Sequence, residues 1–438
     1  MNTAKIFQIS PKEYLFYHGK SASVLNISED TSPELYQLIR SPEDFSGLIS
    51  NKEFQDYLDK IPVNKIANTE DSLHPDLQTL VLPITAGCNL ACPYCFATTS
   101  KGNFNFRDYK EEDIDRLLER LDRKESGTPT TLVFFGGEPL INFKIIKYTI
   151  NQVKEKFSHL KISYSITTNG TLLTPTVAKF LKENQVAVLL SLDGYDNEFN
   201  HRHFKNGRPS VQRVIKAVEL CKRIGLSIEI RATLTSDNPY VFETYMFFEK
   251  LQVEYTIAFA YASENKTHKN LTEFDNQSLQ RMRDAFEKLY DYYMDCLHNK
   301  SRIYNKLFWG YMADIQDRVI RDYACTAGRT YHTVMADGTM FSCAHLMNEQ
   351  DCVMGNIDHW PFKHPEKHSF MPVRVKDVEE CKNCWALHLC HSGCASQKHS
   401  MGKAANQAYL PEKCELDKIQ YEFFIKLFFE YAKIKFHE

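Results

Sequence analysis

Segments patterned as β-strands alternate with segments patterned as α-helices between residues 77 and 265, and this alternation constrains the fold more than any other feature of the chain. The helical segments place apolar residues three or four positions apart, as in Ile114, Leu117, Leu118 and Leu121. The candidate strands cover residues 79–84, 130–135, 162–166, 186–192, 227–233 and 255–259. Six strand–helix units of this kind predict an α/β fold with a parallel sheet and right-handed crossovers.

Three further regions flank this α/β region. Residues 1–75 contain three short strand patterns, at 6–9, 14–17 and 22–27. Helix starts are expected at Ser32-Pro33 and Ser41-Pro42, and a helix over 51–58. We therefore expect a small winged-helix-like domain over 1–75, with a polar linker at 68–76. A helical bridge is expected over 266–319, and a cysteine-rich domain with a C-terminal helix over 320–438.

Composition excludes several classes of function. The chain has 438 residues, a formal net charge of −3 and no apolar run long enough to span a membrane, and its start lacks the pattern of a signal peptide. Residues 1–75 hold seven Lys/Arg against eleven Asp/Glu, which argues against nucleic acid as a partner of this domain. We expect a cytoplasmic protein, whose thirteen cysteines serve metal or cluster binding rather than disulfides.

Cys88, Cys92 and Cys95 form a tight cysteine triad just after the first strand of the α/β region. Three thiolates can hold three irons of a four-iron cluster and leave the fourth iron open, whereas clusters that only transfer electrons normally use four cysteines. The alternative is a zinc site, which needs a fourth Cys or His nearby. The next cysteine is Cys221, so the sequence favours a cluster with an open iron.

Further candidate site residues follow the predicted strands. The carboxyl ends of parallel strands are where ligands collect in α/β folds, and glycines there let the backbone approach a ligand closely. The alternative for each is a turn or capping role, because Asn and Asp before Gly are common in turns. The candidates are Gly136, Gly137, Glu138, Asn169, Ser191, Asp193 and Arg231.

The cysteine triad and the Gly136-Gly137-Glu138-Pro139 segment together resemble the radical S-adenosylmethionine (SAM) superfamily. This resemblance implies a partial (β/α)6 barrel and a [4Fe–4S] cluster whose open iron chelates SAM and cleaves it to an adenosyl radical. It also implies that the Gly-Gly-Glu segment holds the methionyl amine and Arg231 the carboxylate. Ser191 and Asp193 would bond the ribose, with Asn169 as a polar neighbour.

The C-terminal region contains a second set of seven cysteines, which resembles the SPASM domain. That resemblance implies two auxiliary [4Fe–4S] clusters, and hence three clusters in the chain. A zinc ribbon is the alternative, although seven cysteines exceed one zinc site and fall short of two. The implied ligands are Cys325, Cys343 and Cys394 for auxiliary cluster I, and Cys381, Cys384, Cys390 and Cys414 for auxiliary cluster II.

One position departs from the pattern of sulfatase-maturing enzymes. Those proteins have another cysteine six positions before the one matching Cys325, where this chain has Val319. Auxiliary cluster I would then keep an open iron for a substrate thiolate, or be closed by Cys352 or another local residue. Cys221, Cys296 and Cys352 have no partner in the cluster patterns and are predicted to be ordinary buried thiols.

These features predict a radical SAM/SPASM peptide maturase. Residues 1–75 resemble the peptide-recognition element of maturases of ribosomally made peptides, which implies a precursor peptide as substrate, whose leader adds a strand to the small sheet. The alternative for residues 1–75 is an N-terminal cap on the catalytic domain. The sequence around Cys325 resembles maturases that form thioether cross-links, so the expected product is a thioether. A flavodoxin- or ferredoxin-type donor would supply electrons. No acid or base stands out as a catalytic residue. The alternatives are a sulfatase-type maturase that oxidises Ser or Cys, and a non-catalytic binding module carrying zinc or clusters.

Overall fold

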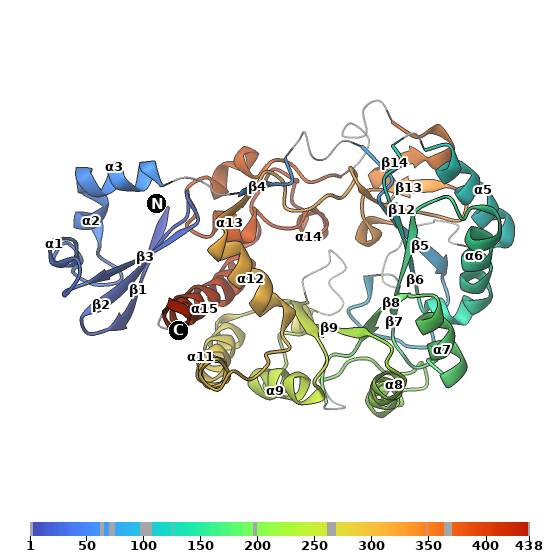
Figure 1. Ribbon diagram of the computed structural model, residues 1–438, viewed down its shortest axis with the longest axis horizontal. Coiled ribbons are helices and arrows are strands. Elements are labelled where there is room, and N and C mark those ends of the chain that lie inside the picture. Colours follow the sequence, from blue (N-terminus) through green and yellow to red (C-terminus); the bar gives the residue numbers. More distant parts are fainter. Residues whose placement is uncertain are drawn as a thin grey trace.

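The computed structural model describes residues 3–61, 65–69, 75–96, 107–124, 126–195, 199–260, 269–347, 349–362 and 370–436. Over these residues the strands form a three-stranded, a nine-stranded and a two-stranded sheet. Figure 1 shows the three-stranded sheet with its helices at one end of the molecule and the large sheet at the other. The C-terminal helix α15 (Pro411–Phe436) lies next to the small sheet.

Six parallel strands in chain order form the greater part of the large sheet, which confirms the predicted α/β fold with a central parallel sheet. Outer helices connect them (Figure 1). The strands are β5 (Thr79–Thr85), β6 (Thr130–Gly136), β7 (Ile162–Thr168), β8 (Ala187–Ser191), β9 (Ile228–Leu234) and β10 (Tyr255–Phe259). The helices are α5 (Glu111–Asp122), α6 (Phe143–Lys156), α7 (Pro175–Glu183), α8 (Val211–Ile224) and α9 (Val241–Leu251).

The helices form where apolar spacing and end signals agree. In α5 the apolar face of Ile114, Leu117, Leu118 and Leu121 is buried against the sheet. The α7 helix begins with Thr174, whose side chain accepts a hydrogen bond from the backbone N–H of Val177. These helices and strands share one continuous apolar core, which fixes the positions of the strand ends where the candidate site residues lie.

The cysteine-rich region extends the large sheet. β12 (Tyr331–Val334) pairs in parallel with β5, and the antiparallel strands β13 (Thr339–Phe341) and β14 (Val353–Asn356) continue from it. Two arginines of α5 strengthen this junction: Arg116 donates to the carbonyl of Ala336 at 2.7 Å and Arg120 to that of Ile357 at 3.1 Å. The α/β region and the cysteine-rich region therefore share a sheet.

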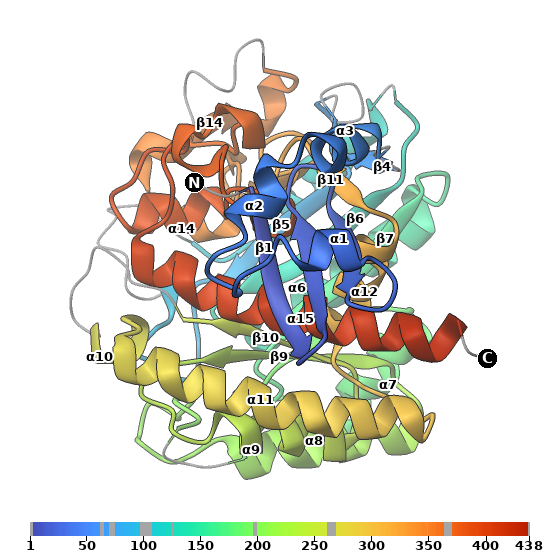
Figure 2. The same ribbon diagram turned by 90° about the vertical axis from the view of Figure 1, so that its left-hand side faces the viewer.

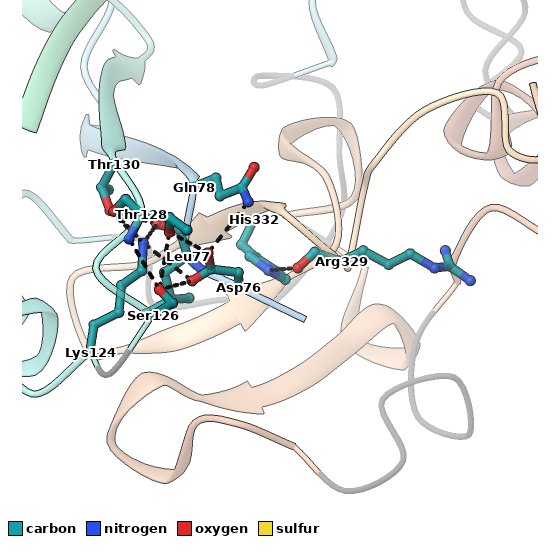
Figure 3. Close-up of polar contacts among 9 residues, drawn as sticks. All are labelled: Asp76, Leu77, Gln78, Lys124, Ser126, Thr128, Thr130, Arg329 and His332. Atoms are coloured by element: carbon teal, nitrogen blue, oxygen red, sulfur yellow. Dashed lines mark hydrogen bonds and ion pairs between the residues drawn. The ribbon is translucent and has the colours of Figure 1, made fainter. Parts of the chain in front are cut away.

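A polar cluster ties the amino ends of β5, β6 and β12 together (Figure 3). The ammonium of Lys124 forms an ion pair with Asp76 at 3.2 Å and donates to the hydroxyl of Thr130 at 3.1 Å. In the same cluster His332, which is fully buried on β12, bonds to the carbonyl of Arg329 at 2.9 Å. This cluster lies at the opposite ends of the strands from the cysteine triad, so its role is structural.

The N-terminal unit consists of an antiparallel sheet followed by three short helices, and it has its own apolar core. The predicted helix start at Ser41-Pro42 is wrong. Residues 41–44 instead form a turn in which the N–H of Asp44 donates to the carbonyl of Ser41, and the helix begins only at Ser46. The elements are β1 (Ala4–Ser10), β2 (Glu13–His18), β3 (Ser23–Ser28), α1 (Pro33–Tyr36), α2 (Ser46–Ser50) and α3 (Lys52–Lys60).

The N-terminal unit is attached to the rest of the protein in two places. Its sheet packs on α15, with Tyr17, Trp385 and Ile425 in a shared core and an ion pair of 3.0 Å between Lys5 and Glu422. In addition, β4 (Lys65–Ala67) pairs in parallel with β11 (Val319–Arg321). The strand β4 thus lies just before the polar linker expected at 68–76, and residues 70–74 of that linker are outside the described residues.

The described part of the helical bridge holds a short helix, α10 (Lys269–Thr272), and two longer ones, α11 (Asn276–His298) and α12 (Lys306–Gln316). Figure 2 shows α11 beside α15, the C-terminal helix, which includes Cys414. Phe286 of α11 and Phe423 of α15 pack with ring centroids 4.8 Å apart. Within the described residues, no helix is long and apolar enough to cross a membrane.

Candidate active site and cysteine centres

The cysteine triad lies in the loop after β5, at the carboxyl end of the parallel sheet, as its position in the sequence predicts. Backbone and side-chain bonds fix this loop from both sides. The N–H of Cys95 donates to the carbonyl of Cys92 at 3.1 Å, and Asn89 donates to the hydroxyl of Thr171 at 2.8 Å. All three thiols are half-buried.

Gly136 and Gly137 are required because the backbone before the triad passes directly over them. A Cβ added to Gly136 would lie 2.3 Å from the carbonyl oxygen of Thr85, and one added to Gly137 would lie 2.3 Å from that of Gly87. Gly136 also has a φ of +133°, which favours glycine. The two glycines thus let the turn after β6 dock against the start of the cysteine loop.

Glu138 is fully buried and bonds the end of β6 to the end of β7. One carboxylate oxygen accepts from the hydroxyl of Thr168 at 2.6 Å and from the N–H of Leu140 at 3.0 Å. The other accepts from the N–H of Asn169 at 2.7 Å. Burial raises the pKa of Glu138, and these hydrogen bonds oppose that shift. Its carboxylate is thus already occupied by neutral donors, which gives Glu138 a positioning role in this structure.

Asn169 connects the end of β7 to the cysteine loop. Its side-chain amide donates to Asn89 at 3.0 Å and approaches the sulfur of Cys88 at 3.9 Å. Its side-chain oxygen accepts from the N–H and the hydroxyl of Thr171. Asn169 is therefore beside the cysteine triad, as expected of a site residue.

Asp193 lies in a buried network after β8. It accepts from the N–H of Thr233 at 2.8 Å, pairs with Arg202 at 2.9 Å and accepts a bond from the phenol of Tyr94, which lies between Cys92 and Cys95. The guanidinium of Arg202 also lies 5.7 Å from the centre of the Tyr94 ring. The sequence did not point to Tyr94 or Arg202, because their partners are distant in the chain.

Arg231 and Ser191 lie at the same end of the sheet, where their backbones pair between β8 and β9. The guanidinium of Arg231 donates to the hydroxyl of Thr256 at 3.2 Å, and nearby atoms desolvate it and lower its pKa although the residue is exposed. His345 is in the same situation: desolvation and the charge of Arg231 lower its pKa to about 4. Its ring stacks on Phe96, with centroids 3.9 Å apart. His345 thereby connects the cysteine-rich region to the triad loop.

The C-terminal cysteines form two groups in space, divided as the resemblance to SPASM implied. Electrostatic interactions connect Cys343 to Cys325 and both of them to Cys394. A second set of interactions connects Cys381, Cys384, Cys390 and Cys414. Burial is the largest cause of a raised thiol pKa in each group, to about 12 for Cys343 and about 11 for Cys381, and neighbouring thiols add to it. Crowded buried thiols of this kind suit ligation of metal ions, which stabilises their ionised form.

Two residues that the sequence did not single out lie between the groups. Lys398 is 2% exposed, donates to the carbonyl of Ala405 at 3.0 Å, and interacts electrostatically with Cys381 and Cys394, one from each group. Tyr409 accepts from the N–H of Cys394. A buried ammonium is costly without an anion nearby. The donor set and this cation therefore fit anionic metal-thiolate centres.

The three remaining cysteines differ in what surrounds their sulfur atoms. Cys221 and Cys296 are buried in the main core, as predicted for ordinary thiols. Cys352 is also buried, but its sulfur lies 3.6 Å from Nε2 of His399, so the prediction of an ordinary thiol misses its polar contacts. Val319 is buried in β11.

Comparison with known proteins identifies the α/β region of the chain. Residues 82–246, from β5 into α9, match the profile of the radical SAM superfamily. This chain contains a radical SAM domain. Over 381 residues it is 28% identical to the cysteine-type anaerobic sulfatase-maturating enzyme of Clostridium perfringens, an alignment that covers 82% of this chain and 96% of that one.

Solved structures share the fold of this chain. Native anSMEcpe with bound AdoMet and the Cp18Cys peptide matches with a TM-score of 0.65 and 23% identity, covering 82% of this chain and 99% of that one. Streptococcus suis SuiB bound to precursor peptide SuiA matches with a TM-score of 0.53 and 17% identity, covering 94% and 98%. The chain is therefore an enzyme that is related in sequence to sulfatase-maturating enzymes and shares its fold with SuiB, and the non-catalytic alternative is excluded. The radical SAM domain implies SAM and one [4Fe–4S] cluster as cofactors.

Proposed function

We propose that this protein is a peptide maturase that binds the leader of a ribosomally made precursor peptide through its N-terminal unit and forms a thioether cross-link in the core of that peptide. The observation that carries the proposal is a groove of about 430 Å³ beside β3, the edge strand of the N-terminal sheet. Leader binding at a sheet edge would separate recognition from the chemistry at the end of the large sheet.

The groove has the form that an added strand requires. β3 pairs only with β2 within the small sheet, so its other edge has backbone groups available for a further strand. Apolar and basic side chains line it: Val24 and Leu25 from β3, Tyr57 and Lys60 from α3, and Arg318 just after α12. Such a lining suits an extended peptide with alternating apolar side chains and some acidic residues.

The comparisons support this choice in two ways. SuiB bound to precursor peptide SuiA aligns with 94% of this chain, against 82% for anSMEcpe with the Cp18Cys peptide, so the fold of SuiB includes more of the chain. Both of those proteins hold a peptide. The position of Val319, which leaves three cysteines in the first C-terminal group, also differs from the sulfatase-maturing pattern.

In the proposed site, Cys88, Cys92 and Cys95 would hold the SAM-binding cluster, and the two C-terminal groups would hold auxiliary clusters. A cluster with bound SAM supplies an electron that cleaves SAM and yields an adenosyl radical able to abstract hydrogen from carbon. The backbone of Gly136 and Gly137 would receive the methionyl amine, Arg231 the carboxylate, and Ser191 a ribose hydroxyl. Asn169, Glu138 and Asp193 hold these strand ends in place.

Thioether formation breaks one C–H and one S–H bond and makes one C–S bond. The hydrogen atom from carbon leaves to the adenosyl group, the S–H proton leaves to solvent, and one electron must be accepted. The auxiliary groups are suited to accept it, because Lys398 places a positive charge between them. A flavodoxin- or ferredoxin-type protein would supply the electron that starts each turnover.

The test uses the anaerobically reconstituted enzyme and the peptide encoded by a short reading frame next to its gene. Fluorescence anisotropy of the labelled peptide is measured with wild type, Tyr57→Ala and Lys60→Glu, and with Glu53→Ala, an exposed α3 residue outside the groove, as control. We expect the groove variants to bind at least about tenfold more weakly. Equal binding by all four proteins would reject leader binding in the groove.

The product separates this function from the second candidate, which rests on the 28% identity to the cysteine-type sulfatase-maturating enzyme. Mass spectrometry of the treated precursor peptide should show a loss of two hydrogen atoms and one thiol that no longer alkylates. Oxidation of a Cys or Ser in a sulfatase-derived peptide, with the precursor peptide unchanged, would instead identify a sulfatase-type maturase.

A further inference from the structure

A cluster of three possible metal ligands lies outside the cysteine groups described above. Asp351 and Cys352 come from the short turn Gln350–Cys352 before β14, and His399 comes from α14 (Ala395–Ser400). Their ligand atoms all lie within 4.8 Å of one another. We propose that Asp351, Cys352 and His399 form a mononuclear site for a zinc-class divalent cation, separate from the iron–sulfur centres.

The distances between the ligand atoms suit one small cation. A tetrahedral zinc ion with Zn–S of about 2.3 Å and Zn–N of about 2.0 Å separates the sulfur and the nitrogen by about 3.5 Å. The observed separation of Cys352 Sγ and His399 Nε2 is 3.6 Å, and Asp351 Oδ2 lies 3.7 Å from the same nitrogen. A thiolate, an imidazole and a carboxylate are ligands that zinc accepts together.

The same geometry argues against a catalytic thiol–imidazole–carboxylate relay. Such a relay uses both ring nitrogens of the histidine, one for the nucleophile and the other for the acid. Here the sulfur of Cys352 and the carboxylate of Asp351 approach the same nitrogen of His399. That nitrogen can carry only one proton, whereas a cation between the three atoms would bind all of them.

The surroundings hold two of the ligands firmly and leave one side open. Cys352 is 1% exposed and lies in a small apolar cluster with Phe341 and Leu346. The edge of Phe370 contacts the ring of His399, with centroids 4.9 Å apart. The side chain of Asp351 is 77% exposed. A cation would thus have three protein ligands and a fourth position facing water, the arrangement of exchangeable rather than purely structural zinc sites.

The test uses the full chain after anaerobic cluster assembly, with zinc chloride as the probe. Zinc, iron and sulfide are measured per chain after gel filtration, and the zinc X-ray absorption edge reports the number of sulfur ligands. The variants are Cys352→Ser, His399→Asn and Asp351→Asn, and the matched control is Cys296→Ser, another buried thiol. Asp351→Asn changes an exposed side chain, so this variant should fold and can test the zinc site even if Cys352→Ser or His399→Asn does not fold.

We expect wild type and Cys296→Ser to bind one zinc with a single sulfur ligand. Cys352→Ser and His399→Asn should lose that zinc with iron and sulfide unchanged, and Asp351→Asn should bind it at least about tenfold more weakly. Loss of iron in Cys352→Ser would overturn the proposal, because Cys352 would then be a cluster ligand. Zinc binding that all variants retain, or that wild type lacks, would overturn it as well.

Discussion

Gly137 shows how a single residue controls the position of the cysteine triad. A Cβ there would lie 2.3 Å from the carbonyl oxygen of Gly87, which immediately precedes Cys88. We predict that Gly137→Ala displaces the loop and lowers the iron content of the reconstituted enzyme by about four per chain, the content of one cluster. Metal analysis and SAM cleavage measure the effect.

The control for that variant is Gly310→Ala. Gly310 lies in α12 with no atom within 4 Å of an added Cβ, and alanine favours helix by up to about 1 kcal/mol. Its iron content and SAM cleavage should match wild type. If Gly137→Ala also keeps full iron and cleavage, the close approach of the two turns does not position the triad.

Glu138 provides a second prediction for a single residue. Both of its oxygens accept hydrogen bonds, whereas glutamine would turn an amide donor toward the donors that surround it. We expect Glu138→Gln to cost about 1–3 kcal/mol of unfolding free energy, and to weaken SAM binding through displacement of Asn169. Chemical denaturation and equilibrium dialysis with SAM measure the two effects. Unchanged values for both would show that Glu138 has no positioning role.

The sequence identified residues whose role depends on local spacing. The cysteine triad, the double glycine and the two C-terminal cysteine groups have short characteristic spacings, so the sequence alone could predict which of these residues lie together. Tyr94, Arg202, His345 and Lys398 were missed because each acts on a partner far away in the chain. A buried lysine in particular has no signature in a sequence, where it looks like any surface lysine.

At the scale of secondary-structure elements, the buried histidine of β12, His332, makes the free energy of unfolding depend on pH. Burial lowers the pKa of His332 to about 4, below its ordinary value of 6.5. The folded state disfavours the charged ring of His332. Above the unfolded pKa of 6.5 the ring is neutral in both states, so it does not change the free energy of unfolding. As pH falls from 6.5 toward 4 the ring becomes protonated only in the unfolded state, and the free energy of unfolding decreases. Between pH 7.5 and 5.5 we predict a loss of about 1.4 kcal/mol from this residue.

Anaerobic denaturant unfolding at the two pH values tests this prediction. His332→Gln should remove most of the loss, whatever its effect on stability at pH 7.5. His298→Gln, which changes an exposed histidine at the end of α11, should leave the loss as in wild type. An unchanged loss in His332→Gln would show that other groups cause the pH dependence.

The elements themselves were largely predictable, for a physical reason that also explains the failures. Strands buried on both faces and amphipathic helices have strong periodic patterns, so β10 was predicted to the residue, and the region of α11 and α12 was predicted to be helical, as one long helix or a pair. The error at Ser41-Pro42 arose because the segment has the residues of a helix start and of a turn alike. Here Asp44 is bonded to Ser41 and Arg40, which closes a turn instead.

At the scale of the whole molecule, Lys398 lies where the two C-terminal cysteine groups meet. Its positive charge favours the addition of an electron to either group. We predict that Lys398→Met keeps its metal content but shifts the reduction potentials of the auxiliary centres to more negative values, as measured by a redox titration monitored by electron paramagnetic resonance. The exposed lysine beside Cys381 supplies the control, Lys382→Met, whose charge is screened by water. Equal potentials in wild type and both variants would rule out a tuning role.

The sequence could not predict which regions pair their strands with one another. The pairing of β12 with β5 and of β11 with β4 connects segments that are hundreds of positions apart, and short strands have weak patterns. Patterns in the sequence reflect local periodicity, so they do not show which separate segments pair in one sheet.

The pairing of β4 with β11 decides where units could be exchanged between related enzymes to redirect them to other peptides. If the exchanged unit ended at residue 75, β4 would be exchanged with it and would no longer be the native partner of β11, whose edge would be left without that pairing. A junction before Lys65 would keep that pair, since the N-terminal unit has its own core up to Ile61. The incoming unit would still need to match the face of α15 that carries Glu422 and Ile425. Successful grafts should therefore share that helix face rather than the groove.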